Sequence, residues 1–148
     1  MFKSQRIEEV EVRSGGLSDD FGKLILRLTI AGLMLFHGVA KLKGGVGGIA
    51  GMLENEGLPT FIAYGVYVGE VVVPVLMILG ILTRLSALVF AFNMVVAIYL
   101  AHRSDVLALG EHGEWAIELQ LLYLLPAIAI VFLGPGRFAL WKRTGLFA

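Results

Sequence analysis

The stretch LILRLTIAGLMLFHGVAKL, residues 24–42, decides the fold because it is long and apolar enough to cross a membrane. About 20 predominantly apolar residues are needed to span the hydrocarbon of a bilayer as a helix. This stretch nevertheless carries three basic side chains, Arg27, His37 and Lys41. Ionisable groups inside a span are costly unless they are paired or hydrated, so these three predict a polar site that faces other helices.

The composition of the whole chain indicates a membrane protein. Of its 148 residues, 57% are hydrophobic and 16% are charged, and the mean hydropathy is +0.83. A soluble domain of this size cannot bury so much apolar surface. The formal net charge of zero argues against a nucleic-acid partner. Because the chain has no cysteine, redox chemistry would need a bound cofactor or a partner chain.

Three further apolar runs follow the first, and together the four predict an all-α integral membrane protein, a four-transmembrane-helix antiparallel bundle. The link between the second and third runs is very short, so those two helices should be antiparallel neighbours. The expected spans are at about 24–43, 61–81, 84–102 and 115–134. The expected organisation is a polar cytoplasmic tail at 1–22, the transmembrane domain at 23–136 and a basic cytoplasmic tail at 137–148.

The distribution of lysine and arginine predicts the orientation of the bundle. Loops on the cytoplasmic side carry an excess of these residues. With the expected spans, nine basic residues fall on the side of the two termini: Lys3, Arg6, Arg13, Lys23, Arg27, Arg84, Arg137, Lys142 and Arg143. Three fall on the other side: Lys41, Lys43 and Arg103. Both termini are therefore expected in the cytoplasm.

Acidic and amide side chains in the later spans match the basic face of the first span in depth. At a rise of about 1.5 Å per residue, Glu70 and Asn93 come close to the level of His37. By the same measure Glu118 comes close to the level of Lys41. The sequence therefore predicts one polar cluster of His37, Glu70 and Asn93 near the midplane, and a second of Lys41 with Glu118 nearer the outer face.

Glu70 has a further unusual feature, because Pro74 follows it by four residues. A proline cannot donate to the carbonyl four residues before it, and that carbonyl belongs to Glu70. Irregular backbone at membrane depth is tolerated where it is buried in protein or lines a wet cavity. Glu70, with His37 at its level, is therefore the candidate catalytic group.

Each polar residue also has a structural interpretation. Arg27 and Arg84 could extend to the headgroups at the cytoplasmic edge, and Lys41 with Glu118 could be a structural ion pair. The candidates for substrate binding are Arg27, Lys41, Arg84, Asn93 and Glu118.

The histidines do not predict a metal centre. His37 lies near mid-depth, whereas His102 and His112 lie at or beyond the outer edge. A bis-histidine haem needs both ligands at one level, so neither haem nor metal is expected in this chain.

Seven short motifs follow one another along the chain, and their order resembles that of a known family. They are Arg27, His37–Gly38 with Lys41, the GLP of residues 57–59, Gly69–Glu70, the LGxxTR of residues 79–84, Glu118 and the GPGR of residues 134–137. In this order they resemble the DoxX family, which includes DoxD-type subunits, of small four-helix bacterial membrane proteins.

The resemblance implies a multi-pass protein of the bacterial cytoplasmic (inner) membrane with a quinone-linked role. Some members of the family are implicated in thiosulfate oxidation coupled to quinone and others in quinone or oxidative-stress responses, and several act as subunits of larger redox assemblies. The expected cofactor is a quinone. The expected partners are the lipid bilayer and other membrane subunits or further copies of this chain.

Three functions are compatible with the sequence. The first is a quinone-linked membrane oxidoreductase component with a buried polar site between the helices, and the second is a structural or assembly subunit of a larger membrane complex. The third is a small proton or solute carrier that uses Glu70.

Overall fold

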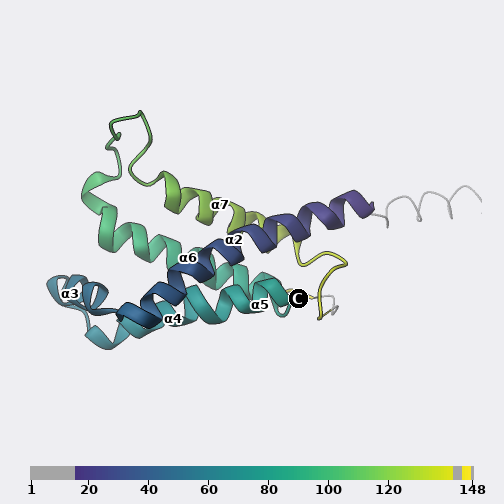
Figure 1. Ribbon diagram of the computed structural model, residues 1–148, viewed down its shortest axis with the longest axis horizontal. Helices are drawn as coiled ribbons and strands as arrows, with labels where there is room; N and C mark the ends of the chain where they lie inside the picture. Colours follow the sequence, from purple (N-terminus) through teal and green to yellow (C-terminus); the bar gives the residue numbers. More distant parts are fainter. Residues whose placement is uncertain (1–15, 142–144, 148) are drawn as a thin grey trace, which may run out of the picture.

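The computed structural model describes residues 16–141 and 145–147 as an all-helical chain (Figure 1). Within these residues the only β-structure is a single bridge between Leu109 and Trp115. The longer helices are α2 (Leu17–Gly44), α6 (Thr83–His102) and α7 (Glu118–Leu133). The shorter ones are α3 (Gly47–Asn55), η1 (Thr60–Tyr64), α4 (Gly65–Tyr67), η2 (Val68–Val72), α5 (Val73–Leu79) and η3 (Arg103–Asp105).

The first helix begins earlier than the apolar pattern predicts. α2 starts at Leu17 and carries Asp19 and Asp20 in its first turn, where carboxylates complement the positive end of the helix dipole. The helix ends at Gly44, and the next glycine takes a φ of 80°. Part of the expected polar tail, residues 16–22, is therefore helix or its cap, while residues 1–15 of that tail lie outside the described residues.

The second apolar run is a continuous but irregular helix, Thr60–Leu79. It begins as the 3₁₀ turn η1, passes through α4 and becomes a π-helix at η2 before α5. The π-helix contains Glu70 and ends two residues before Pro74, whose missing amide donor predicts irregular backbone, so the predicted disruption is confirmed. The helix ends at Gly80, whose left-handed conformation (φ 71°) favours glycine.

Three helical segments, Leu17–Gly44, Thr60–Leu79 and Thr83–Asp105, are long and apolar enough to cross a membrane among the described residues. α7 is apolar but has 16 residues, a length of about 24 Å. It begins at Glu118, three residues later than the expected span. The structure is thus that of a helical membrane protein, and the fourth crossing stays a prediction.

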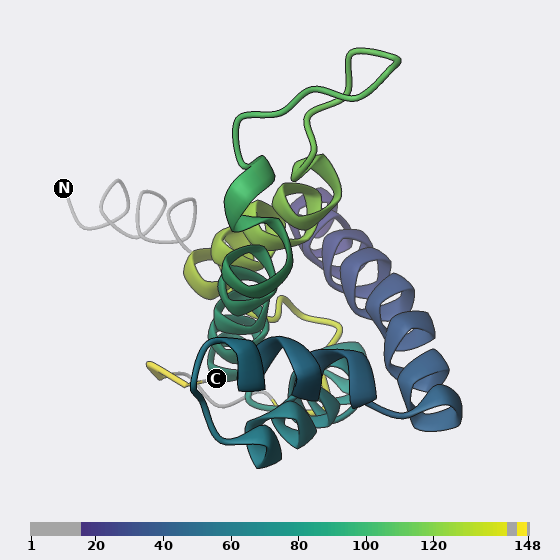
Figure 2. The ribbon, with the colours of Figure 1, turned by 90° about the vertical axis from the view of Figure 1, so that its left-hand side faces the viewer.

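The helices form a bundle whose two ends differ (Figures 1 and 2). At the terminal end, where α2 begins and α7 ends, Leu140 donates to the carbonyl of Leu79 and Asp20 pairs with Arg137. At the opposite end, the α3 end, α2 and α7 diverge in both views. The buried core lies between them and consists of Ile30, Ala31, Met34, Val73, Met77, Ala87, Phe90, Ala91, Met94, Tyr123, Ala127 and Ile130.

The short helix α3 covers the end of the bundle that lies opposite the terminal end. Leu53 is 2% exposed and packs with Ala63 of η1. Just beyond α3, both carboxylate oxygens of Glu56 accept hydrogen bonds from the guanidinium of Arg103, at 2.6 and 3.0 Å. The same guanidinium lies 4.9 Å from the centre of the Tyr99 ring. These contacts hold α3 against the end of α6.

Candidate functional site

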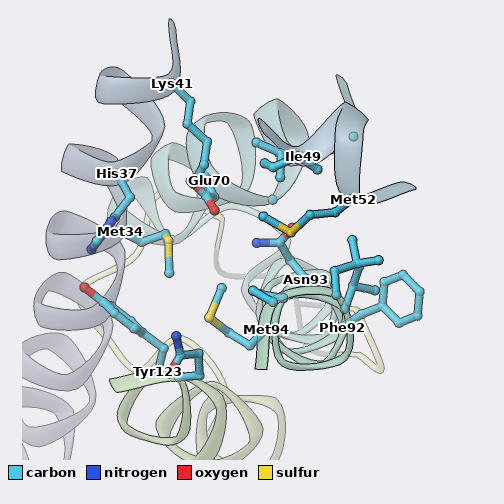
Figure 3. A pocket seen from close by; sticks show the side chains of 18 of the residues that line it. Met34, His37, Lys41, Ile49, Met52, Glu70, Phe92, Asn93, Met94 and Tyr123 are labelled. Carbon is cyan, nitrogen blue, oxygen red and sulfur yellow. The ribbon is translucent and has the colours of Figure 1, made fainter. Parts of the chain in front are cut away.

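A cavity of about 390 Å³ lies between α2, α3, the α4–η2 segment, α6 and α7 (Figure 3). Its walls are mainly apolar, and the side chains of Met34, Met52 and Met94 contribute three thioethers. The polar side chains that line it are His37, Lys41, Glu70, Asn93, His102, Gln120 and Tyr123. The structure therefore brings together four of the predicted site residues: His37, Lys41, Glu70 and Asn93.

An ion pair between Lys41 and Glu70 forms the polar wall of the cavity. The Lys41 Nζ lies 2.5 Å from the Glu70 Oε2, and the side chains are 29% and 7% exposed. Side chains of a helix lean toward its N-terminus. Because α2 and the Thr60–Leu79 helix run in opposite directions, Lys41 and Glu70 lean toward each other, as Figure 3 shows.

The backbone around Glu70 is shaped by the π-helix and by Gly38 of α2. A Cβ atom added at Gly38 would lie 2.2 Å from the carbonyl oxygen of Glu70 and 2.7 Å from a methyl group of Val71. Only glycine lets α2 approach so closely. The extra residue in the π-helical turn and this close approach together set the position of the Glu70 carboxylate opposite Lys41.

Asn93 and His37 occupy opposite sides of the cavity. The amide of Asn93 packs against Gly69, where an added Cβ would lie 2.5 Å from the Asn93 Cγ. His37 projects from α2, and its ring makes an edge-to-face contact with Tyr123 at a centroid distance of 6.0 Å. All three residues of the predicted midplane cluster, His37, Glu70 and Asn93, line this cavity, and His37 and Asn93 do so from opposite sides (Figure 3).

The predicted pair of Lys41 with Glu118 is wrong. Lys41 reaches Glu70 instead, and Glu118 is an exposed residue in the first turn of α7 that does not line the cavity. The reason is that α2 and α7 diverge toward the α3 end, so equal depth along two helices does not bring their side chains together (Figures 1 and 2).

Arg27 and Arg84 lie at the terminal end, away from the cavity. Arg27 is 2% exposed, and its terminal nitrogens donate to the carbonyls of Pro135 and Phe138. Arg84 donates to the carbonyl of Val131 at 2.9 Å. Both arginines hold the end of α7 and the segment after it, and neither lines the candidate site.

Sequence reasoning missed Gln120 and Tyr123 as site residues. The Nε2 of Gln120 lies 2.9 Å from the Nε2 of His102, while its Oε1 is buried without a hydrogen-bond partner. Tyr123 is 7% exposed and packs on Phe90 in the core. The sequence feature that could have identified them is their separation by three residues, which places both side chains on one face of α7.

The geometry of the described residues offers no cluster of three histidine, aspartate or glutamate side chains that could hold a metal ion. The wall of this mainly apolar cavity carries the Lys41–Glu70 ion pair, two amides, two imidazoles and the phenol of Tyr123. This defines the class of protein: a helical membrane protein with a polar site between its helices.

The chain belongs to the DoxX family. The family model of that name matches residues 22–103, which contain α2 from residue 22 onward, α3, the Thr60–Leu79 helix and α6. This match covers every predicted site residue except Glu118, and it includes the Lys41–Glu70 pair.

Three bacterial proteins are similar to this chain over most of their length. One from Bacillus subtilis, named "Putative oxidoreductase CatD", is 37% identical over 83% of this chain and 87% of its own. An uncharacterized membrane protein of Mycobacterium tuberculosis is 33% identical over 81% of this chain and 79% of its own. An uncharacterized protein of Haemophilus influenzae is 32% identical over 78% and 84%, respectively. No solved structure matches the chain.

Proposed function

We propose that this protein is the quinone-binding component of a membrane oxidoreductase, with the quinone head group in the cavity beside Lys41 and Glu70. The observation that carries the proposal is the ion pair itself. A pair that is 29% and 7% exposed in an apolar wall costs desolvation free energy that well-packed apolar side chains would not cost. Ionisable residues retained at such a cost inside a membrane domain are functional candidates by default.

The cavity has the properties that a quinone ring requires. Sites for small molecules and cofactors are mostly apolar, occupy about 300–1,000 Å³ and carry a few polar groups that fix orientation. This cavity, at about 390 Å³, lies within that range. Its three methionines suit a flat ring, because thioether sulfur makes favourable contacts with aromatic edges.

The polar residues have separate roles in this proposal. The Lys41 ammonium and the Asn93 amide donate hydrogen bonds to a ring oxygen and orient it. Glu70 accepts or supplies a proton beside that oxygen, with His37 as the second titratable group on the cavity wall. The quinone, when bound, supplies the capacity to take up two electrons and two protons. The electrons come from a partner subunit or a small reductant, because the chain has no cysteine and the described residues offer no metal cluster.

The family supports the redox part of this proposal. A relative that shares 37% of its aligned residues carries the word oxidoreductase in its name. Because Arg27, Arg84 and Glu118 lie outside the cavity, the proposal gives substrate contact to Lys41 and Asn93 only.

The proposal places the chain in the cytoplasmic membrane of a bacterium, with α7 as the fourth crossing. The described ends of the chain meet at the terminal end, where Asp20 pairs with Arg137. An even number of crossings puts both ends on one side, and the lysine and arginine distribution favours the cytoplasm for that side.

The decisive experiment is to extract and quantify quinone from gently purified protein by mass spectrometry. The wild type is compared with Glu70→Gln and with Glu118→Gln, a matched control because that carboxylate is exposed and outside the cavity. We expect near-stoichiometric quinone in the wild type and the control, and a clear loss in Glu70→Gln. Quinone at the level of the surrounding lipid in all three would refute the proposal.

A second function, that of an assembly subunit in a larger membrane complex, is favoured by the loop between η3 and α7. The loop projects beyond the helices (Figure 2) and is held by the Leu109–Trp115 bridge. Leu107 and Leu109 at its surface are 89% and 72% exposed. If the loop docks on another subunit, Leu107→Ser with Leu109→Ser will release a stoichiometric partner in mild detergent, and Glu111→Ser in the same loop will not.

A further inference from the structure

The cavity opens sideways through an apolar seam. Seven of the residues that line the cavity are exposed: His37, Met52, Ile62, Gly65, Phe92, Ala101 and Leu119. The seam consists of the four that come from α3, the Thr60–Leu79 helix and the middle of α6, namely Met52, Ile62, Gly65 and Phe92. Phe92 is 68% exposed. Figure 3 shows Met52 and Phe92 together at one edge of the cavity, with Lys41 and His37 toward the opposite edge. None of the four seam residues carries a charge, so the opening suits hydrocarbon better than water.

Helix packing explains why the seam is open. α4 packs against α2, η1 and η2, whereas α6 packs against α3 and η2. Gly65 lies between these contacts, and a Cβ atom added there would meet no heavy atom within 4 Å. The absence of a side chain at Gly65 therefore leaves open space beside α4, within a segment that is long enough to cross the membrane.

We propose that this seam is a lateral portal for the isoprenoid chain of a lipid-soluble quinone. The inference rests on the proposed function and narrows its substrate class from quinones in general to long-chain membrane quinones. The polar head lies against Lys41 and Glu70, and the chain leaves the cavity past Gly65 and Phe92 into the bilayer. An apolar chain needs a path with no polar groups to desolvate, and the four seam residues provide one.

The test fills the seam and compares two quinones that share a ring. Gly65→Trp adds a bulky side chain at a position with open space, and Gly32→Trp is the matched control. Gly32 also has no atom within 4 Å of an added Cβ, and it lies on α2 outside the cavity lining. The probes are menadione and phylloquinone, which carry the same methylnaphthoquinone ring without and with a long isoprenoid-derived chain. Menadione cannot alkylate this protein at a thiol because the chain has no cysteine.

Binding is measured in lipid nanodiscs against protein-free nanodiscs of the same composition. We expect Gly65→Trp to weaken the binding of phylloquinone by about tenfold or more, because the isoprenoid-derived chain of this quinone loses its apolar contacts. Menadione should bind the variant as it binds the wild type, and Gly32→Trp should change neither. If Gly65→Trp proves unable to fold, Gly65→Leu, with a smaller side chain, is measured in the same way with the same expectation.

The outcomes separate the portal from the proposed function. If Gly65→Trp weakened the binding of both quinones equally, the portal would be overturned, because the new side chain would then fill the head-group cavity. Binding of both quinones unchanged by Gly65→Trp would also overturn it, while leaving the quinone site in place. Failure of the wild type to bind either quinone would overturn the proposed function and the portal with it.

Discussion

Replacing Gly38 by alanine tests the packing that places Glu70. The added Cβ would lie 2.2 Å from the Glu70 carbonyl oxygen and 2.7 Å from its carbonyl carbon. Both atoms belong to the backbone, so no rotamer change relieves the contact. To reach an ordinary van der Waals separation of 3.4 Å from the oxygen, α2 and η2 must move apart by about 1.2 Å (3.4 less 2.2).

The energetic effect of Gly38→Ala follows from this displacement. Overpacking of a tight interface costs about 1–3 kcal/mol, and the better helix propensity of alanine offsets about 0.5–1 kcal/mol of it. The net loss of up to about 2.5 kcal/mol corresponds to a fall of up to roughly 10 °C in the unfolding midpoint for a chain of this size. The displacement also separates Lys41 from Glu70, so bound quinone should fall with stability.

Gly32→Ala is the matched control for this change. It makes the same substitution in the same helix, at a glycine where an added Cβ meets nothing within 4 Å. Only the better helix propensity of alanine then changes the stability, so the free energy of unfolding should rise by about 0.5–1 kcal/mol. Thermal unfolding in mild detergent compares the two variants with the wild type. If Gly38→Ala proves as stable as Gly32→Ala, the close approach of α2 to Glu70 is incorrect.

Three further changes test other contacts. Lys41→Met and Glu70→Gln should each lower stability by up to about 3 kcal/mol, and the double mutant should recover part of that loss; strictly additive effects would contradict the pair. Arg27→Lys should lower stability by about 2–3 kcal/mol, because an ammonium cannot bridge two carbonyls as a guanidinium does; an unchanged melting temperature would contradict the contacts. The hydrogen bonds and then the charge of Arg103 hold the pKa of Glu56 below its ordinary value of 4.5. Because this folded-state pKa is lowered, the pair stabilises above the ordinary pKa and is lost as the pH falls through the lowered one. The protection of α3 amides, measured against the intrinsic exchange rate at each pH, should therefore fall between pH 7 and about pH 3 in the wild type, and an equal fall in Glu56→Gln would rule out this pair as its cause.

The positions of the helices were largely predictable because they follow from apolar length alone. The third expected span, 84–102, matches α6 within one residue. The start of the fourth helix was less predictable because it depends on contacts of the preceding loop. The backbone of Trp115 forms a β-bridge with Leu109, and the indole N–H of Trp115 donates to the carbonyl of Val106. These two contacts keep Trp115 in the loop, so the helix begins only at Glu118.

The composition of the candidate site was predictable, but its pairing was not. Counting rise per residue placed Glu70 near the level of His37 and assigned Lys41 to Glu118. This count used Cα positions and neglected the lean of side chains toward the helix N-terminus. On antiparallel helices, that lean brings a lysine late in one helix toward an acid early in the next, as Lys41 and Glu70 show.

The positions of Arg27 and Arg84 could not be predicted from side-chain pairing, because their acceptors are backbone carbonyls. Such acceptors leave no residue type to recognise in a sequence. The only local signal was the GPG motif at residues 134–136, which ends α7 and leaves carbonyls near its end without intrahelical donors.

Three features that meet at Glu70, from the second apolar helix and from α2, each reduce the stability of the bundle. The π-helix gives up regular hydrogen bonding, and Gly38 opposite it carries the entropic cost of glycine within a helix. The buried carboxylate and its lysine cost more to bury than an apolar pair would. A fold that only had to pack four helices would need none of them. Because local departures from stable packing tend to gather where chemistry requires them, their coincidence at one carboxylate argues that Glu70 is retained for what it does in the cavity.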